Sequence, residues 1–181
     1  TKIRNRSKQI LVNESYEHFV ASPLIQKKDL ENIYKFAAKD IYVTHILIGH
    51  SSSSLGSPPE RSKSDALLLA HEIKKMYNNG ENIDVLAKKF SDDPSVKRNS
   101  GLLEWVRWGA TVNEFQTAAF QLEENVLSDP ILTNFGYHLI LVSKTKKSEL
   151  SYFTGYAYKN AVNNLSKGAI RNQLYEAALN Y

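Results

Sequence analysis

Two histidines lie inside segments that otherwise have the composition of buried β-strands. His45 belongs to the apolar run IYVTHILIG (residues 41–49), and His138 belongs to GYHLILVSK (residues 136–144). A buried imidazole requires hydrogen-bond partners for its ring nitrogens, because each nitrogen is either a donor or an acceptor. The strand pattern permits the two rings to partner each other across adjacent strands. A structural pair and a preorganised polar centre are both consistent with this pattern.

The other reactive residue types do not favour metal or thiol chemistry. The chain has five histidines and no cysteine, which excludes disulfides, thiolate metal sites and cysteine nucleophiles. The histidines do not show close ligand spacing, and no nearby carboxylate pair completes a set, so we expect no metal site and no cofactor. Asp93 lies in SDDPS (residues 91–95), whose composition alone predicts a turn.

The composition is that of a globular protein. A length of 181 residues suggests one domain, alone or with helical additions, and 42% hydrophobic residues can bury a normal core. The net charge of +4 is small, and the sequence contains no block of five or more like charges. We therefore expect no nucleic-acid partner. The apolar runs are too short to cross a bilayer. The chain begins at Thr1 without a signal peptide, which indicates a mature protein or an excised fragment.

The elements that must position the two histidines form an α+β pattern. Three segments have the apolar and β-branched content of strands: 41–49, 101–106 and 136–144. Three segments have apolar residues at helical spacing: 65–80, 82–90 and 112–122. An extended edge segment is expected around Pro130, because proline cannot donate to a strand ladder. With helices expected before and after, the order indicates a small sheet with helices packed on it.

Four sequence blocks between residues 41 and 144 follow one another in a characteristic order. They are THILI, LAKKFSDDPS, GLLEWVRWGATVNEFQTAAFQL and SDPILTNFGYHLILV, and the most specific part is Thr-x-x-Gly-Tyr-His. In order and spacing they resemble the PpiC-like parvulin family of peptidyl-prolyl cis-trans isomerases, over the length of a whole parvulin domain. The resemblance implies a four-stranded antiparallel sheet with surrounding helices. The helical lead-in is similar to that of parvulin domains in bacterial periplasmic multi-domain folding chaperones.

The resemblance assigns roles to individual residues. His45 and His138 match the family's two facing histidines on neighbouring central strands, and Thr133 matches the threonine that hydrogen-bonds within that group. Asp93 lies where parvulins carry either cysteine or aspartate. These four residues are the expected catalytic group. The expected substrate-binding residues, on the walls of the proline pocket, are Leu103, Thr111, Phe115 and Phe135.

The chain also departs from the family pattern. Glu104 replaces the second glycine of the usual Gly-Asp-Leu-Gly, which puts the local backbone in doubt. Thr111 is smaller and more polar than the usual methionine, so we expect a weaker proline pocket. Phosphate-selecting parvulins carry a basic cluster after the first strand, whereas this chain has Gly49, His50 and serines there. We therefore expect no selectivity for phosphorylated substrates.

Simpler interpretations of the same residues stay open at the level of sequence. The histidines could form a purely structural pair, Asp93 could be only a turn residue, and Leu103 and Phe115 could be only core residues. The corresponding functional alternative is a catalytically weak or inactive parvulin-fold module. Such a module would hold unfolded chains or dock on a partner complex.

The resemblance implies a function in protein folding. We expect a peptidyl-prolyl cis-trans isomerase and folding chaperone that acts on extended X-Pro segments of secreted or outer-membrane proteins. Its expected partners are unfolded or extended proline-containing polypeptides, and a protein complex of the cell envelope. Rotation about an X-Pro bond breaks no covalent bond, so a pocket that favours the twisted amide is sufficient. The expected location is the bacterial periplasm, and the absence of cysteine fits an oxidising compartment.

Three regions are expected along the chain. An N-terminal helical arm covers residues 1–40, a parvulin-like isomerase domain covers 41–145, and a C-terminal helical arm covers 146–181. Each arm has an apolar stripe that would otherwise face water. We therefore expect the two arms to pack together as one helical unit.

Overall fold

A computed structural model describes residues 35–148, within which Lys39–Ser148 forms one compact unit. In chain order its elements are β1 (Lys39–Ile48), α4 (Lys63–Asn78), α5 (Ile83–Phe90), α6 (Val96–Asn99), β2 (Leu102–Val106), α7 (Asn113–Ala119), β3 (Ile131–Thr133) and β4 (Gly136–Lys147). The elements predicted between residues 41 and 144 are all present, and α6 is a short addition. The predicted helical arms lie almost wholly outside the described residues.

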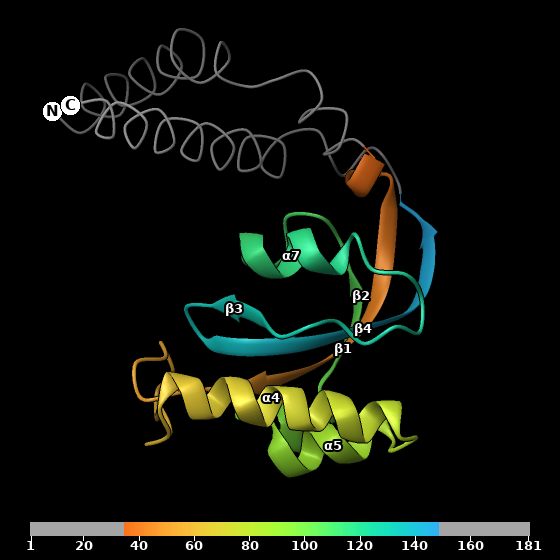
Figure 1. Cartoon of the computed structure of the whole chain (residues 1–181). Helices are drawn as coiled ribbons and strands as arrows, with labels where there is room; N and C mark the ends of the chain where they lie inside the picture. Colours follow the sequence, from red (N-terminus) through yellow and green to blue (C-terminus); the bar gives the residue numbers. More distant parts are fainter. Residues whose placement is uncertain (1–34, 149–181) are drawn as a thin grey trace, which may run out of the picture. The chain divides into compact units, whose positions relative to one another are not determined.

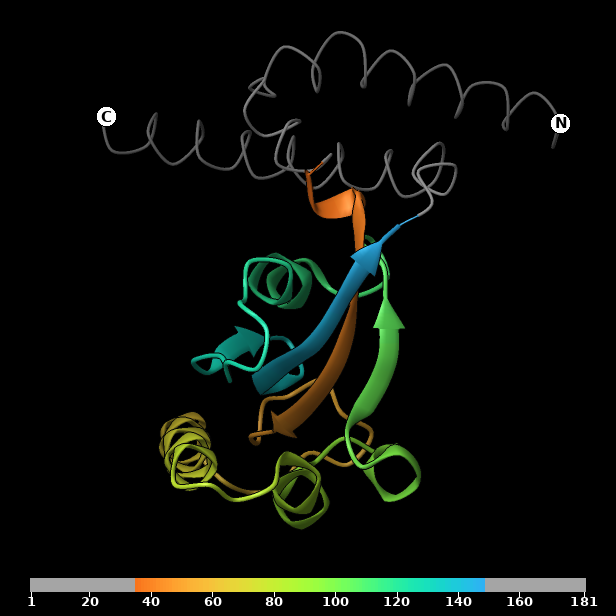
Figure 2. The same ribbon diagram turned by 90° about the vertical axis from the view of Figure 1, so that its right-hand side faces the viewer.

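The four strands form one antiparallel sheet in the order β2-β1-β4-β3, which can be followed in Figure 2. The predicted α+β fold with a four-stranded antiparallel sheet is therefore confirmed. β1 and β4 are the central strands, and their register places His45 opposite Ile140 and Leu47 opposite His138. The two histidines are thus diagonal neighbours on one face of the sheet, a geometry that lets long or aromatic side chains meet.

Helices cover both faces of the sheet. Figure 1 shows α7 on one side, and α4 and α5 on the other. The histidines face the α7 side, where Phe115 of α7 contacts both rings. The main apolar core lies on the α4 and α5 side, where residues from both helices and both central strands are buried. Its fully buried members include Ile46, Ile48, Ala66, Ala70, Ile73, Leu86, Ala87 and Leu139.

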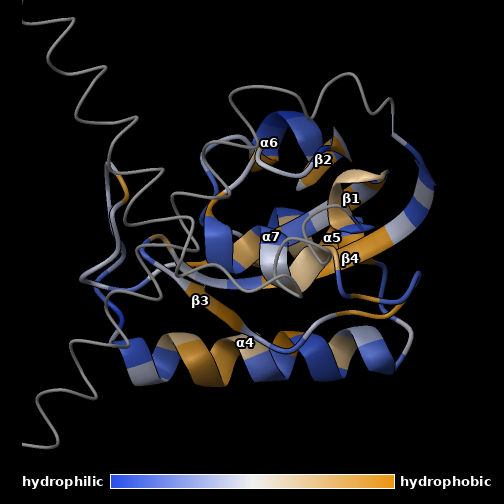
Figure 3. Cartoon of the chain, turned by 90° about the horizontal axis from the view of Figure 1, so that it is seen from above, coloured by the Kyte–Doolittle hydropathy of each residue, from blue (hydrophilic) through white to orange (hydrophobic). Residues whose placement is uncertain are grey.

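The helices of this core begin and end where the sequence provides the necessary residues. Ser62 caps α4 in a capping box with Asp65, and the Asn82 side chain caps α5. Gly80, with φ of 98°, follows the end of α4. In Figure 3, hydrophilic and hydrophobic residues alternate along α4, as expected for a helix with one buried face. Capping and amphipathicity therefore fix the layer that supports the central strands.

One residue of β2, Glu104, has a backbone conformation that favours glycine. Glu104 has φ of 58°, in the left-handed region that favours glycine. It pairs with Val43 beside a register shift in β1. Glu104, which stands where the family pattern has a glycine, is therefore a left-handed residue within the strand. Left-handed conformations cost about 1–2 kcal/mol for residues with a Cβ.

Candidate active site

The two histidine rings lie in direct contact at the centre of the sheet. The Nδ1 atoms of His45 and His138 are 3.3 Å apart. Their planes are almost parallel, at 14°, with ring centroids 5.5 Å apart. Both residues are 5% exposed. The strand register brings the rings together, because it sets the two side chains on one face of neighbouring strands with an offset of two residues.

Asp93 extends this pair on the side of β1. Its Oδ2 lies 2.8 Å from Nε2 of His45, and its Oδ1 accepts hydrogen bonds from the backbone N–H and the hydroxyl of Ser95, at 2.7 and 2.8 Å. The hydrogen bond to His45 holds the pKa of Asp93 well below its usual range; the two bonds from Ser95 act in the same direction and partial burial opposes them. The carboxyl group is therefore ionised at neutral pH.

Thr133 extends the pair on the side of β3. Its Oγ1 lies 2.9 Å from Nε2 of His138 and accepts a hydrogen bond from the backbone N–H of Phe135 at 3.1 Å. Burial, and to a lesser degree the proximity of His45, lower the pKa of His138 to about 3 against the opposing effect of Asp93. His138 is therefore neutral at physiological pH, and one of its nitrogens must act as an acceptor.

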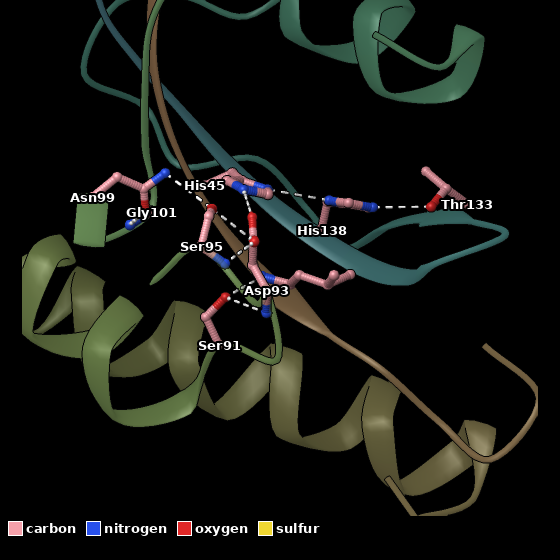
Figure 4. A network of polar contacts seen from close by, with 9 residues as sticks. His45, Ser91, Asp93, Ser95, Asn99, Gly101, Thr133 and His138 are labelled. Carbon is pink, nitrogen blue, oxygen red and sulfur yellow. Dashed lines mark hydrogen bonds and ion pairs between the residues drawn. The ribbon is translucent and has the colours of Figure 1, made fainter. Parts of the chain in front are cut away.

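The four polar side chains form one continuous chain of hydrogen bonds, shown in Figure 4. An ionised Asp93 can only accept, so Nε2–H of His45 donates to it. In the arrangement with one proton on each ring, Nδ1 of His45 accepts from Nδ1–H of His138, and Nε2 of His138 accepts from the hydroxyl of Thr133. Every proton in the chain then has one consistent direction, and both rings have defined tautomers.

An apolar cavity of about 450 Å³ opens beside the two rings. It is lined by His45, Leu103, Ala110, Thr111, Val112, Phe115, Phe135 and His138. The four residues mapped to the proline pocket all line it, as do both histidines, whereas Asp93 and Thr133 lie behind the rings. Sequence reasoning missed Ala110 and Val112, because the resemblance to parvulins assigned no pocket role to either position.

Two wall residues of the cavity have distinct environments. Phe115, which is 3% exposed, presents its ring edge-on to both histidines, with centroid distances of 5.7 and 5.3 Å. It is therefore both a wall of the cavity and a core residue. The hydroxyl oxygen of Thr111 is buried and has no hydrogen-bond partner among the described residues. An unpaired buried hydroxyl is unfavourable.

Sequence reasoning also missed residues behind Asp93. The Ser91 hydroxyl accepts from the backbone N–H of Asp93, the Ser95 hydroxyl donates to the Asp93 carboxylate, and the Asn99 amide donates to Ser95. A serine in a turn-forming stretch is usually explained by the turn itself, so composition gives no reason to single these residues out. Within residues 35–148, no group of three potential ligands could hold a metal ion, and no helix is long and apolar enough to cross a membrane.

Comparison with known proteins identifies the family. A model of the PPIC-type PPIase domain (rotamase) matches residues 45–144. The chain belongs to this family. It is 35% identical over 129 residues to foldase protein PrsA 3 of Bacillus cereus, covering 71% of this chain and 38% of that protein. It is 31% identical over 128 residues to chaperone SurA of Chromohalobacter salexigens, covering 71% of this chain and 28% of that protein.

The fold is shared with a solved structure as well. The crystal structure of the peptidylprolyl isomerase PrsA from Bacillus anthracis superposes with a TM-score of 0.56 at 24% identity, covering 94% of this chain and 72% of that chain. The chain spans well under half the length of the two curated relatives. The residues matched by the PPIC-type family model begin at His45 and include His138, so the whole polar chain lies within the family domain.

Proposed function

We propose that the domain is a peptidyl-prolyl cis-trans isomerase that acts on extended X-Pro segments of unfolded polypeptides. The observation that carries this proposal is the apolar cavity whose wall includes two mutually hydrogen-bonded histidine rings. Uncatalysed rotation faces a barrier of roughly 18–20 kcal/mol and takes tens of seconds or longer. The reaction breaks no covalent bond, so it needs binding and electrostatic stabilisation of the twisted amide rather than a nucleophile.

The cavity residues divide these tasks. The proline ring packs against Leu103, Phe115 and Phe135, which exclude water from the amide. In the twisted state the amide loses its resonance, so the electrostatic demands of its carbonyl and nitrogen change. The rings of His45 and His138 present fixed dipoles to this group, because their partners define both tautomers. Preorganised dipoles need no reorganisation as the amide twists, which is the source of the stabilisation.

We further propose that catalysis does not require a phosphorylated substrate. Arg61, at the end of the loop after β1, donates to Asp92 at 2.5 Å and is also 3.4 Å from the backbone oxygen of Gly49. Its charge is compensated within the domain and is not directed at a ligand. This pairing supports the expectation from sequence that the loop does not select phosphate.

The names of the relatives support a role in protein folding. They are named a foldase and a chaperone. We propose that the chain acts in the bacterial periplasm or its equivalent outside the cytoplasmic membrane, on secreted or outer-membrane proteins, and docks on an envelope complex. A chain without cysteine suits such an oxidising compartment.

A pair of peptides tests the proposed substrate class. One peptide contains Ala-Pro and the other phosphoserine-Pro, in the same flanking sequence, and the cis-trans rate is measured with each. The proposal predicts that the protein accelerates cis-trans isomerisation of the Ala-Pro peptide above its uncatalysed rate. The phosphoserine-Pro peptide should show no greater acceleration. Isomerisation of the phosphorylated peptide alone would contradict the proposed lack of selectivity. Binding of both peptides without isomerisation would instead support the alternative, a binding module.

A further inference from the structure

The Asp93 carboxylate belongs to a closed ring of hydrogen bonds that begins and ends at His45 (Figure 4). From the side chain of His45 the ring passes to Asp93 at 2.8 Å and on to the hydroxyl of Ser95 at 2.8 Å. It continues to the amide of Asn99 at 3.0 Å and to the N–H of Gly101 at 3.0 Å. The carbonyl of Gly101 then accepts from the backbone N–H of His45 at 2.8 Å.

The direction of every bond in this ring is determined by chemistry. The N–H of Gly101 can only donate, so Asn99 must turn its carbonyl oxygen toward it and its NH₂ group toward Ser95. The hydroxyl of Ser95 therefore accepts from Asn99 and directs its own proton to Asp93. An ionised Asp93 in turn accepts from His45. No member can reverse without leaving another group unpaired.

Gly101 closes the ring because no larger residue fits its position. Its φ is 81°, and a Cβ there would lie 2.3 Å from the backbone oxygen of His45. The glycine therefore brings the end of α6 into backbone contact with β1 at His45 itself. This contact fixes the position of residues 91–101, which carry Asp93, relative to β1, which carries His45.

The consequence for the site concerns the orientation of one carboxylate. Oδ1 of Asp93 is occupied by both the N–H and the hydroxyl of Ser95, so the carboxylate cannot rotate and Oδ2 points at His45. Asp93 is 17% exposed in its side chain, so water could otherwise compete for either oxygen. The tautomer of His45 depends on this orientation, and the tautomer of His138 depends on His45.

We propose that Ser95 and Asn99 are positioning residues that hold Asp93, and through it the tautomers of both histidines, in the active arrangement. Neither residue lines the cavity. Their effect on catalysis rests on the proposed isomerase function, whereas their effect on the histidine tautomers does not. The proposal therefore predicts a change in turnover with unchanged substrate binding, together with a change in the ring nitrogens of the histidines.

The test uses Asn99→Asp and Ser95→Ala in the full chain. The carboxylate in Asn99→Asp still accepts from Gly101 but cannot donate to Ser95, so the ring is broken at one bond. Asn78→Asp, the same change at an exposed position at the end of α4, is the control. Ser95→Thr keeps the hydroxyl and is the conservative rescue. The readouts are kcat and KM on an Ala-Pro peptide, and the ¹⁵N shifts of the ring nitrogens.

We expect kcat to fall about fivefold in both variants with KM unchanged, because Asp93 loses the hydrogen bond from the Ser95 hydroxyl in each. Ser95→Ala removes that hydroxyl, and the new carboxylate in Asn99→Asp draws its proton away from Asp93. The ¹⁵N shifts of His45 should move toward mixed tautomers in both variants and stay fixed in Asn78→Asp and Ser95→Thr. If the ¹⁵N shifts of the imidazole nitrogens in Asn99→Asp and Ser95→Ala are identical to those of the wild type, the proposal is overturned. A wild type without isomerase activity would contradict the proposed function, and the ring shifts would still decide whether Ser95 and Asn99 position Asp93.

Discussion

The two buried histidines differ in their immediate partners. His45 faces the carboxylate of Asp93, whereas His138 faces only the other ring and the hydroxyl of Thr133. A protonated His138 would have no direct counter-ion in a buried position, and its pKa is accordingly lowered to about 3. His138 is therefore neutral in the folded site, and at mildly acidic pH its ring is protonated only in the unfolded chain.

Acid should destabilise the fold through His138. Because its pKa is about 3 in the folded state and about 6.5 in the unfolded state, only the unfolded chain takes up this proton between those values. Above about pH 6.5, His138 has no effect on the free energy of unfolding. Between about pH 6.5 and pH 3, this free energy falls by about 1.4 kcal/mol for each unit by which the pH decreases. Urea unfolding between pH 6 and 4 should give a shallower pH dependence for His138→Gln than for the wild type. Equal slopes would contradict the assignment.

Thr111 should limit the proline pocket. Thr111→Met adds apolar surface, and each buried CH₂ contributes roughly 0.8 kcal/mol. One or two such groups at the transition state would raise kcat/KM about tenfold. Thr111→Val is the control for polarity, since it removes the unpaired hydroxyl at nearly constant size. It should raise the free energy of unfolding by about 1 kcal/mol. A flat rate in Thr111→Met would exclude the pocket as the limiting feature.

At the scale of elements, the left-handed φ of Glu104 makes β2 less stable than it would be with a glycine at this position. Glu104→Gly should raise the free energy of unfolding by about 0.5–1 kcal/mol, because the relief of the left-handed φ exceeds the added entropy of the unfolded chain. Glu104→Ala keeps a Cβ at the same φ and should give no such gain. Chemical denaturation of the three proteins measures both differences. Equal stabilisation by alanine would show that the side chain of Glu104, rather than its backbone, is unfavourable.

The elements also show what the sequence could predict. The apolar periodicity of α4 and α5 and the composition of β1 and β4 are local properties, and the structure agrees with them. The four-stranded antiparallel sheet and its two neighbouring central strands were predicted from the resemblance to parvulins, whereas the strand order came from the structure. The four-residue α6 has no periodic signal, and the bond between Asn99 and Gly101 depends on a left-handed backbone that a sequence pattern does not reveal. The ring around Asp93 could therefore be found only from the structure.

At the scale of the whole molecule, the main apolar core beneath α4 and α5 lies within Lys39–Ser148. We therefore predict that a fragment of residues 35–148 folds on its own and unfolds in urea in a single transition. Its kcat/KM on a short Ala-Pro peptide should be within about twofold of the full chain, because the cavity and polar chain lie inside it. An unfolded fragment would show that the predicted arms at 1–40 and 146–181 are required for this domain.

The central claim is that the cavity beside His45 and His138 accelerates rotation about an X-Pro bond. Exchange spectroscopy by NMR on a short unphosphorylated Ala-Pro peptide measures this rotation directly, with substoichiometric wild type or Asp93→Ala. We predict cis-trans exchange cross-peaks with the wild type and a clearly slower exchange with Asp93→Ala, in a variant that remains folded. Peptide resonances that shift on binding without any exchange in the wild type would contradict the claim, and would identify the domain as a binding module.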